Sequence, residues 1–233
     1  MYGMWPKDLS ICAKCKRPAC IYPNICKNLN SSHEPINNLY NQVRKVEGIK
    51  KAFVGSGVRY DLFITRKDSK AEREYFENLF LHHVSGRLKV APEHTSEKVL
   101  KIMRKPSFEL FKQLKQWFDA LNEKFGQKQQ LIPYFISSHP GSTEQDMKQL
   151  AEETRKLNFK LEQVQDFTPT PMTLASTIYY TGINPYTGEK VYVARRVEEK
   201  RKQQSYFFWY QNESKYLFTQ SKKRPHKRNP PIR

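Results

Sequence analysis

The chain has 233 residues, of which 41 are Lys or Arg and 23 are Asp or Glu, giving a formal net charge of +18 at pH 7. A charge of this sign favours anionic partners. Aromatic residues make up 13% of the chain, enough to build a core, so disorder throughout is excluded. No apolar run approaches the roughly 18 residues of a membrane span and the start lacks a secretory signal, which predicts a cytoplasmic protein without a membrane partner.

Composition predicts three segments: a Cys-rich metal-binding segment over 1–33, an α/β domain over 34–192 and a basic C-terminal region over 193–233. Residues 190–233 hold 13 Lys or Arg against 3 Asp or Glu. The stretch Ser221–Pro231 has no apolar periodicity and is predicted to be a disordered basic tail. Such a tail either binds nucleic acid or only keeps a chain in solution. The aromatic run Tyr206–Tyr210 either stacks on bases or packs a C-terminal helix onto the domain.

The middle segment alternates strand-like and helix-like patterns. Apolar runs typical of strands lie at residues 52–54, 88–91, 131–136 and 161–164. Helical spacing of apolar residues predicts helices over residues 35–47, 70–81, 95–104, 110–125 and 147–157, the last opened by a Ser142/Gln145 capping box. This order is typical of βα units with a parallel sheet. Four units are too few for a complete (β/α)8 barrel of about 250 residues, so the fold is an open α/β sheet or part of a barrel.

Polar side chains follow each predicted strand. Because parallel α/β folds bind ligands at the carboxyl ends of their strands, these loops predict a ligand site, although each residue alone also fits an ordinary structural role, as Thr95 does by capping a helix. The candidate site residues are Ser56, Arg59, Asp61, Glu93, His94, Ser137, Ser138 and Asp166. The sequence has no P-loop, no G-x-S-x-G elbow, no zincin motif and no complete dinucleotide fingerprint, which disfavours the corresponding enzyme classes.

The four cysteines of the chain, Cys12, Cys15, Cys20 and Cys26, form a C-x2-C-x4-C-x5-C pattern. In a cytosolic protein such a cluster predicts a metal site before disulfides. Four thiolates suit either zinc or an iron–sulfur cluster. The spacing matches neither the usual zinc ribbon nor the bacterial ferredoxin run, so the metal stays open between these two, and four unligated thiols are the remaining alternative.

Several long strings resemble the YgiQ-type radical S-adenosylmethionine proteins, and the resemblance extends from Met1 to about Tyr192. It rests on the cysteine pattern with Asn28, Leu29 and His33, and on residues 56–61, 82–86, 88–96, 133–141 and 163–172. The resemblance implies a partial (β/α)6 barrel whose four visible strands correspond to strands three to six. It also implies a [4Fe–4S] cluster that binds S-adenosylmethionine and cleaves it reductively to a 5′-deoxyadenosyl radical, and it places the eight candidate residues around that cofactor or the substrate.

One departure from that family matters for function. The C-x3-C-x2-C motif that holds the radical cluster in the family does not occur in this sequence, and the four cysteines correspond to a different, auxiliary segment. We therefore expect a fragment of a radical enzyme, inactive alone, or one half of a split enzyme that needs a partner chain to supply the missing N-terminal strands. An alternative from another class is a basic, metal-stapled protein that binds nucleic acid through its tail.

Overall fold

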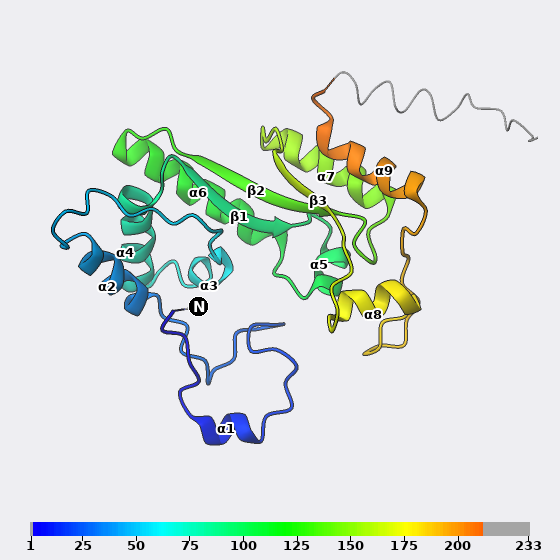
Figure 1. The fold of residues 1–233 in the computed structure, drawn as a ribbon, viewed down its shortest axis with the longest axis horizontal. Coiled ribbons are helices and arrows are strands. Elements are labelled where there is room, and N and C mark those ends of the chain that lie inside the picture. The colour runs from blue at the N-terminus through cyan, green and yellow to red at the C-terminus, as the bar shows by residue number, and fades with distance from the viewer. Residues whose placement is uncertain (1, 212–233) are drawn as a thin grey trace, which may run out of the picture. The chain divides into compact units, whose positions relative to one another are not determined.

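The computed structural model describes residues 2–211, and the predicted basic tail Ser221–Pro231 lies outside them. Contacts divide the chain into two compact units, with the boundary between Ile136 and Ser137. Within residues 2–211, no helix combines the length and the apolar composition needed to cross a membrane. Each unit is described by itself below (Figure 1).

The first unit holds most of the helices and the longer strands. Its elements are α1 (Leu9–Ala13), α2 (Glu34–Val43), α3 (Tyr60–Ile64), α4 (Lys70–Asn78), the π-helix η1 (Leu79–His83), β1 (Arg87–Glu93), α5 (Glu97–Met103), α6 (Phe108–Phe125) and β2 (Gln130–Ser137). In this unit α2 packs against α4, and α3 packs against both α4 and α6. The two strands are parallel, with Arg87 opposite Gln130 and Glu93 opposite Phe135. One extra residue of β1 between Val90 and Glu93 shifts the register and bends the strand end.

The second unit contains α7 (Glu144–Lys156), β3 (Gln163–Asp166), α8 (Leu174–Thr181), α9 (Val197–Ser205) and the short 3-10 helix η2 (Tyr206–Phe208). Helix α9 and η2 both pack on α7. The aromatic run serves this packing, because Phe207 is fully buried and the Tyr210 hydroxyl donates to the carbonyl of Leu161 at 2.6 Å. The interpretation that these aromatic residues pack onto the domain is therefore confirmed.

The fold is α/β with an open sheet of three strands in the order β1-β2-β3, not a closed barrel. The predicted strand at residues 52–54 is wrong. Val54 donates to the carbonyl of His83, and the chain meets β1 only at a single parallel bridge from Val58 to Val90. Gly55 and Gly57 both precede that bridge and weaken extended pairing there, so no continuous ladder forms.

The predicted helices are confirmed with small changes at their ends. The N-cap of α7 is Thr143, one residue after the predicted cap Ser142. Thr143 and Asp146 form the reciprocal capping box in place of Ser142 and Gln145. Ser96, not Thr95, stands at the N-cap of α5. These shifts are of the size expected where several adjacent residues are all competent caps.

Aromatic side chains fill the core of the first unit. Phe63 stacks on Phe76 with ring centroids 4.9 Å apart, and Trp117 meets the edge of Phe76 at 4.6 Å. Both phenylalanines are fully buried. Because these rings come from α3, α4 and α6, their packing holds the three helices together. Arg59 caps α3 and Asp61 lies in its first turn, so both residues belong to this packed group.

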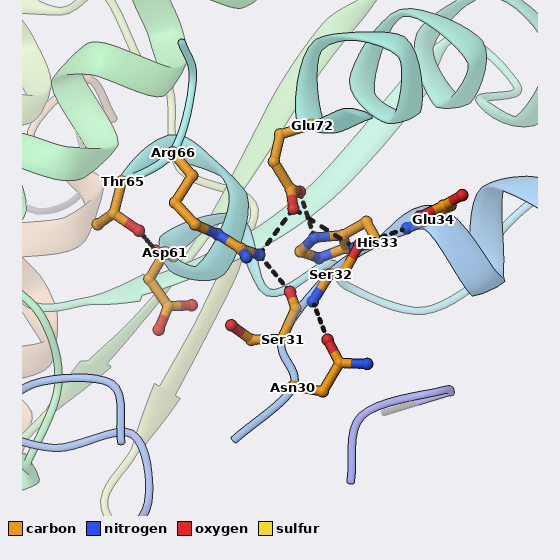
Figure 2. Close-up of polar contacts among 9 residues, drawn as sticks. All are labelled: Asn30, Ser31, Ser32, His33, Glu34, Asp61, Thr65, Arg66 and Glu72. Atoms are coloured by element: carbon orange, nitrogen blue, oxygen red, sulfur yellow. Dashed lines mark hydrogen bonds and ion pairs between the residues drawn. The ribbon is translucent and has the colours of Figure 1, made fainter. Parts of the chain in front are cut away.

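A buried charged network ties the segment after the cysteines to this core (Figure 2). Glu72 on α4 is 1% exposed and accepts from His33 Nδ1 at 2.5 Å and from Arg66 Nη2 at 2.7 Å. Arg66 also donates to the carbonyl of Ser31. The His33 ring lies flat on Tyr75, with centroids 4.4 Å apart. One carboxylate therefore joins the residues before α2, the end of α3 and α4 itself.

We predict that Glu72→Gln lowers the free energy of unfolding by about 2–4 kcal/mol, because it removes the charge of a buried acceptor that binds the buried His33 and the half-buried Arg66. The matched control is Glu74→Gln on the same helix, where the carboxylate is 57% exposed and only Lys70 Nζ lies nearby, at 3.7 Å. That change is expected to cost less than about 0.5 kcal/mol. Urea denaturation measures both, and equal destabilisation by the two variants would contradict the prediction.

Candidate functional site

The carboxyl end of β1 presents a carboxylate whose hydrogen bonding is incomplete. Glu93, the last residue of the strand, is 9% exposed and adopts a left-handed backbone with φ of 67°. Its Oε1 accepts from Lys105 Nζ at 2.9 Å, whereas Oε2 is buried and meets no hydrogen-bond donor within residues 2–211. A buried carboxylate oxygen without a donor is energetically costly, so this atom marks a place where a ligand donor fits.

Arg59 and Asp61 lie beside this strand end. The guanidinium of Arg59 binds both carboxylate oxygens of Asp61, with Nε to Oδ1 at 2.8 Å and Nη2 to Oδ2. The hydrogen bonds that Arg59 donates to Asp61 raise the pKa of Arg59, and the charge of Glu93 adds to the effect. The same two carboxylates also raise the pKa of Tyr60, although burial of the phenol is the larger cause. The structure thus brings Arg59, Asp61 and Glu93 into one electrostatic neighbourhood.

His94 and Ser56 have different surroundings from these three residues. The His94 ring is fully buried, and its Nδ1 accepts from the backbone amides of Thr95 at 2.9 Å and Ser96 at 3.0 Å. The ring proton therefore resides on Nε2, and the imidazole shapes the turn that leads into α5. Ser56 is exposed in the loop before Val58. The hydroxyl of Thr95 is buried and finds no partner within the described residues, which adds a second polar atom without a partner next to His94.

A separate polar cluster forms in the second unit, around Asp166 at the end of β3. The hydroxyls of Ser137 and Ser138 both donate to Asp166 Oδ1, the second at 3.1 Å. Ser138 is fully buried and has φ of 58°, and the carbonyl of Ser137 accepts from the amide of Phe167 at 2.8 Å. Three of the predicted site residues are thus brought together, directly after β2 and at the end of β3.

Gln203 on α9 holds this cluster in place. Its Oε1 accepts from the amide of Ser138 and from the hydroxyl of Ser142, each at 3.0 Å, while its Nε2 donates to the carbonyl of Ser142 at 2.8 Å. Gln203 is 2% exposed. Because a buried side-chain amide is satisfied by the turn that follows β2, α9 fixes the backbone conformation at Ser138.

The neighbouring His139 is a buried, neutral imidazole. Burial lowers its pKa to about 4, and its hydrogen bond to the carbonyl of Pro140, 2.9 Å from Nδ1, opposes the shift. The Nδ1 atom therefore carries the proton at neutral pH. The ring also meets the edge of Phe167, with centroids 5.0 Å apart, which makes His139 a packing residue of the loop after β2.

The four cysteines are free thiols, with Cys12 and Cys26 half-buried and Cys15 and Cys20 exposed. Two of the sulfur atoms accept hydrogen bonds, Cys12 from Asn28 Nδ2 at 3.3 Å and Cys15 from the amide of Arg17 at 3.4 Å. Their donor chemistry fits a thiophilic metal. In the part of the chain that is described, however, no three His, Cys, Asp or Glu side chains are grouped as metal ligands.

Two contributors to these clusters carry no signal in the sequence. Lys105 follows α5, twelve residues after the glutamate that it pairs with, and Gln203 reaches Ser138 across 65 residues. Lysine and glutamine side chains are usually solvated, so neither residue type at these positions predicts a buried partner. Only the positive φ of Glu93 and Ser138, which is unusual for residues other than glycine, distinguishes the two strand ends as special.

The chain is similar to proteins known as UPF0313 proteins. It is 57% identical to one from Porphyromonas gingivalis over 217 residues and 56% identical to one from Bacteroides thetaiotaomicron over 219 residues. An archaeal UPF0313 protein, from Methanocella arvoryzae, is 46% identical over 201 residues. These matches cover 91%, 92% and 86% of this chain but 34%, 35% and 33% of the relatives. The chain therefore spans about a third of the length of these relatives.

A family model described as a domain of unknown function, DUF3362, matches residues 162–228. The match begins just before β3 and includes α8, α9 and η2 in the described part of the chain. It thus covers Asp166 and Gln203, the residues that organise the serine cluster after β2. The comparisons thus show similarity to UPF0313 proteins. The narrower expectation, a relationship to the YgiQ-type radical S-adenosylmethionine proteins, stays a prediction.

We predict that His139 makes stability depend on pH between about 6.5 and 4. In this window the unfolded state binds the proton and the folded state does not, so stability falls as the pH falls, by about 3 kcal/mol in total. His139→Asn keeps a donor for the Pro140 carbonyl and does not titrate, so its loss of stability from pH 6.5 to 4 is expected to be smaller by that amount. Urea denaturation across this range measures it.

The comparison variant is His82→Asn, which removes an exposed imidazole of the first unit whose pKa is also lowered, by partial burial and by Arg44. It is expected to reduce the pH dependence by less than His139→Asn does, because the His82 ring is largely in contact with solvent. An equal reduction in the two variants, or no reduction in His139→Asn, would contradict the buried neutral state of His139.

Proposed function

We propose that this chain forms part of the cofactor- and substrate-binding face of a radical S-adenosylmethionine enzyme, with Glu93 as the principal contact to S-adenosylmethionine. The single observation that carries the proposal is the buried Oε2 of Glu93, which lacks a donor within residues 2–211. Its support from sequence is the resemblance over the strings 56–61, 88–96 and 133–141, together with the similarity to UPF0313 proteins.

The residues at the end of β1 fit this cofactor chemically. S-adenosylmethionine carries a sulfonium, an ammonium and two ribose hydroxyls, and each is a partner for an acceptor that is buried and negatively charged. Glu93 would accept from the ammonium or a ribose hydroxyl, while Lys105 holds its other oxygen in place. Arg59 is already engaged by Asp61 on two atoms, so its role is to orient Asp61 and to balance the charge of Glu93.

The radical chemistry itself requires a group that this sequence does not ligate. When bound to a reduced [4Fe–4S] cluster, S-adenosylmethionine supplies hydrogen-abstracting chemistry. The C-x3-C-x2-C motif for that cluster does not occur in these 233 residues, so none of the four cysteines is assigned to it. Within the proposal, the work of this chain is to bind and orient: Glu93 of the first unit positions the cofactor, and the second unit offers a polar cluster of its own at Ser137, Ser138 and Asp166.

We also propose that Cys12, Cys15, Cys20 and Cys26 bind an auxiliary metal, either zinc or an iron–sulfur cluster. The hydrogen bonds to the sulfurs of Cys12 and Cys15 support this, because such bonds stabilise thiolates. Since the described conformation gathers no three of these ligands, binding must draw the segment together, in the way that metal binding couples to folding in small cysteine-rich modules.

For the cofactor site, we predict that Glu93→Gln in a full-length UPF0313 relative with glutamate at the aligned position lowers reductive cleavage of S-adenosylmethionine by about 10- to 100-fold. The amide keeps the shape and can still accept from Lys105, but it loses the charge that binds the cofactor cation. Formation of 5′-deoxyadenosine under dithionite, together with equilibrium dialysis of labelled S-adenosylmethionine, measures the effect. Glu109→Gln, at a carboxylate that is 67% exposed on α6, is the control.

A Glu93→Gln enzyme with unchanged cleavage and unchanged cofactor affinity would remove Glu93 from the site. The same dialysis on this chain alone separates two cases. Saturable binding that Glu93→Gln weakens assigns the contact to this chain. Binding that is equal in Glu93→Gln and Glu109→Gln assigns it to other residues and overturns the proposal.

For the cysteine segment, we predict that the chain purified without oxygen and reconstituted holds one metal centre, and that Cys12→Ser/Cys15→Ser removes it. Iron, sulfide and zinc are measured per chain. Iron and sulfide in equal amounts indicate a cluster, and zinc alone indicates a structural site. The control is Lys14→Ser/Lys16→Ser in the same segment, which is expected to keep the metal. A folded chain without stoichiometric metal would show that the thiols are not ligands.

A further inference from the structure

A cavity lies in the first unit at the opposite end of the strands from Glu93. Its volume is about 620 Å³, and Gly86 and Gln129, which immediately precede β1 and β2, are part of its wall. The amide of Gln130 donates to the carbonyl of Gly86 at 2.8 Å, which joins the beginnings of the two strands beside the cavity. A cavity of this size is in the range of ordinary small-molecule sites and suits one nucleotide-sized ligand.

The charge of the wall is strongly biased. Arg44 at the end of α2 and Lys50 and Lys51 in the following segment line the cavity, and no Asp or Glu is among its lining residues in the described chain. None of these three cations forms an ion pair within residues 2–211, although Arg44 Nη1 donates to Asn78 Oδ1 at 3.2 Å. Three cations around one hollow, without a carboxylate to compensate them, attract an anion.

The cavity also has an aromatic surface next to these cations. Phe53 is 48% exposed, and Lys51 Nζ lies 5.9 Å from the centroid of its ring. An exposed aromatic ring offers a flat surface on which a base can stack. Burial lowers the pKa of the lining His82, and the charge of Arg44 lowers it further, so the field of Arg44 extends across the cavity wall.

We propose that this cavity binds a free nucleoside phosphate, with Lys50, Lys51 and Arg44 contacting the phosphates and Phe53 stacking on the base. A nucleotide carries both groups that this wall can bind. Its phosphates pair with the ammonium groups, and its base stacks on the aromatic ring beside them. The site is distinct from the end of β1 that carries Glu93, because it lies where the strands begin. Its ligand is an anion, whereas the ligand proposed for Glu93 carries a cation.

The test is isothermal titration of the full chain with ADP and with pyrophosphate, which share phosphates and differ by the adenosine. We expect saturable ADP binding that is tighter than pyrophosphate binding. Lys50→Gln/Lys51→Gln is expected to weaken both by about tenfold or more, because two charge-assisted contacts are lost. Phe53→Leu is expected to weaken ADP by about fivefold or more and to leave pyrophosphate unchanged.

Two controls complete the design. Lys67→Gln/Lys70→Gln removes the same charge from exposed positions outside the cavity and is expected to keep the ADP affinity, as is Glu93→Gln. Circular dichroism confirms that each variant is folded. Absence of ADP binding, or equal weakening by the two lysine pairs, overturns the site. Equal affinity for ADP and pyrophosphate, or an unchanged affinity of Phe53→Leu for ADP, overturns the nucleotide assignment.

Discussion

The position of the functional segments in the first unit depends on the carboxylate of Glu72. This side chain is almost fully buried, and its two oxygens bind His33 and Arg66. His33 is the last residue of the Cys-rich segment, and Arg66 follows the helix that carries Asp61. A buried charge is stable only while its partners are present. These contacts therefore hold the end of the Cys-rich segment, α3 and α4 together. Arg59 and Asp61 lie at the start of α3, so their position depends on the same contacts.

Two carboxylates of the first unit are withdrawn from solvent. Glu72 and Glu93 are both buried and both pair with cations of the first unit. In a chain with a net charge of +18, surface cations such as Lys50 and Lys51 form no ion pair in the described structure. The two ends of β1 have opposite electrostatic character, with a carboxylate oxygen that lacks a donor at one end and a wall of cations without carboxylate partners at the other. A cation and an anion are the ligands complementary to these two ends.

Sequence patterns predicted the amphipathic helices well, because helices such as α6 place apolar residues at three- and four-residue steps over eighteen positions. The run at residues 52–54 was predicted wrongly, since three apolar residues do not specify a strand when glycines follow them. Of the candidate site, the sequence located the strand ends but not the contacts. Lys105 and Gln203 act through distant partners, and no local pattern records such pairs. The predicted convergence of all eight residues on one face stays a prediction.

Glu93 and Ser138 share one backbone feature. Each lies at or just after the end of a strand, and each adopts a left-handed φ, 67° and 58°, that glycine adopts without penalty and other residues adopt at a cost of about 1 kcal/mol or more. Glycine at either position would relieve the backbone but would also delete a hydrogen-bonded side chain. Lys105 would lose its carboxylate partner at the first position, and Asp166 would lose one of its two hydroxyl donors at the second. The two strand ends therefore exchange backbone stability for polar groups held in fixed positions.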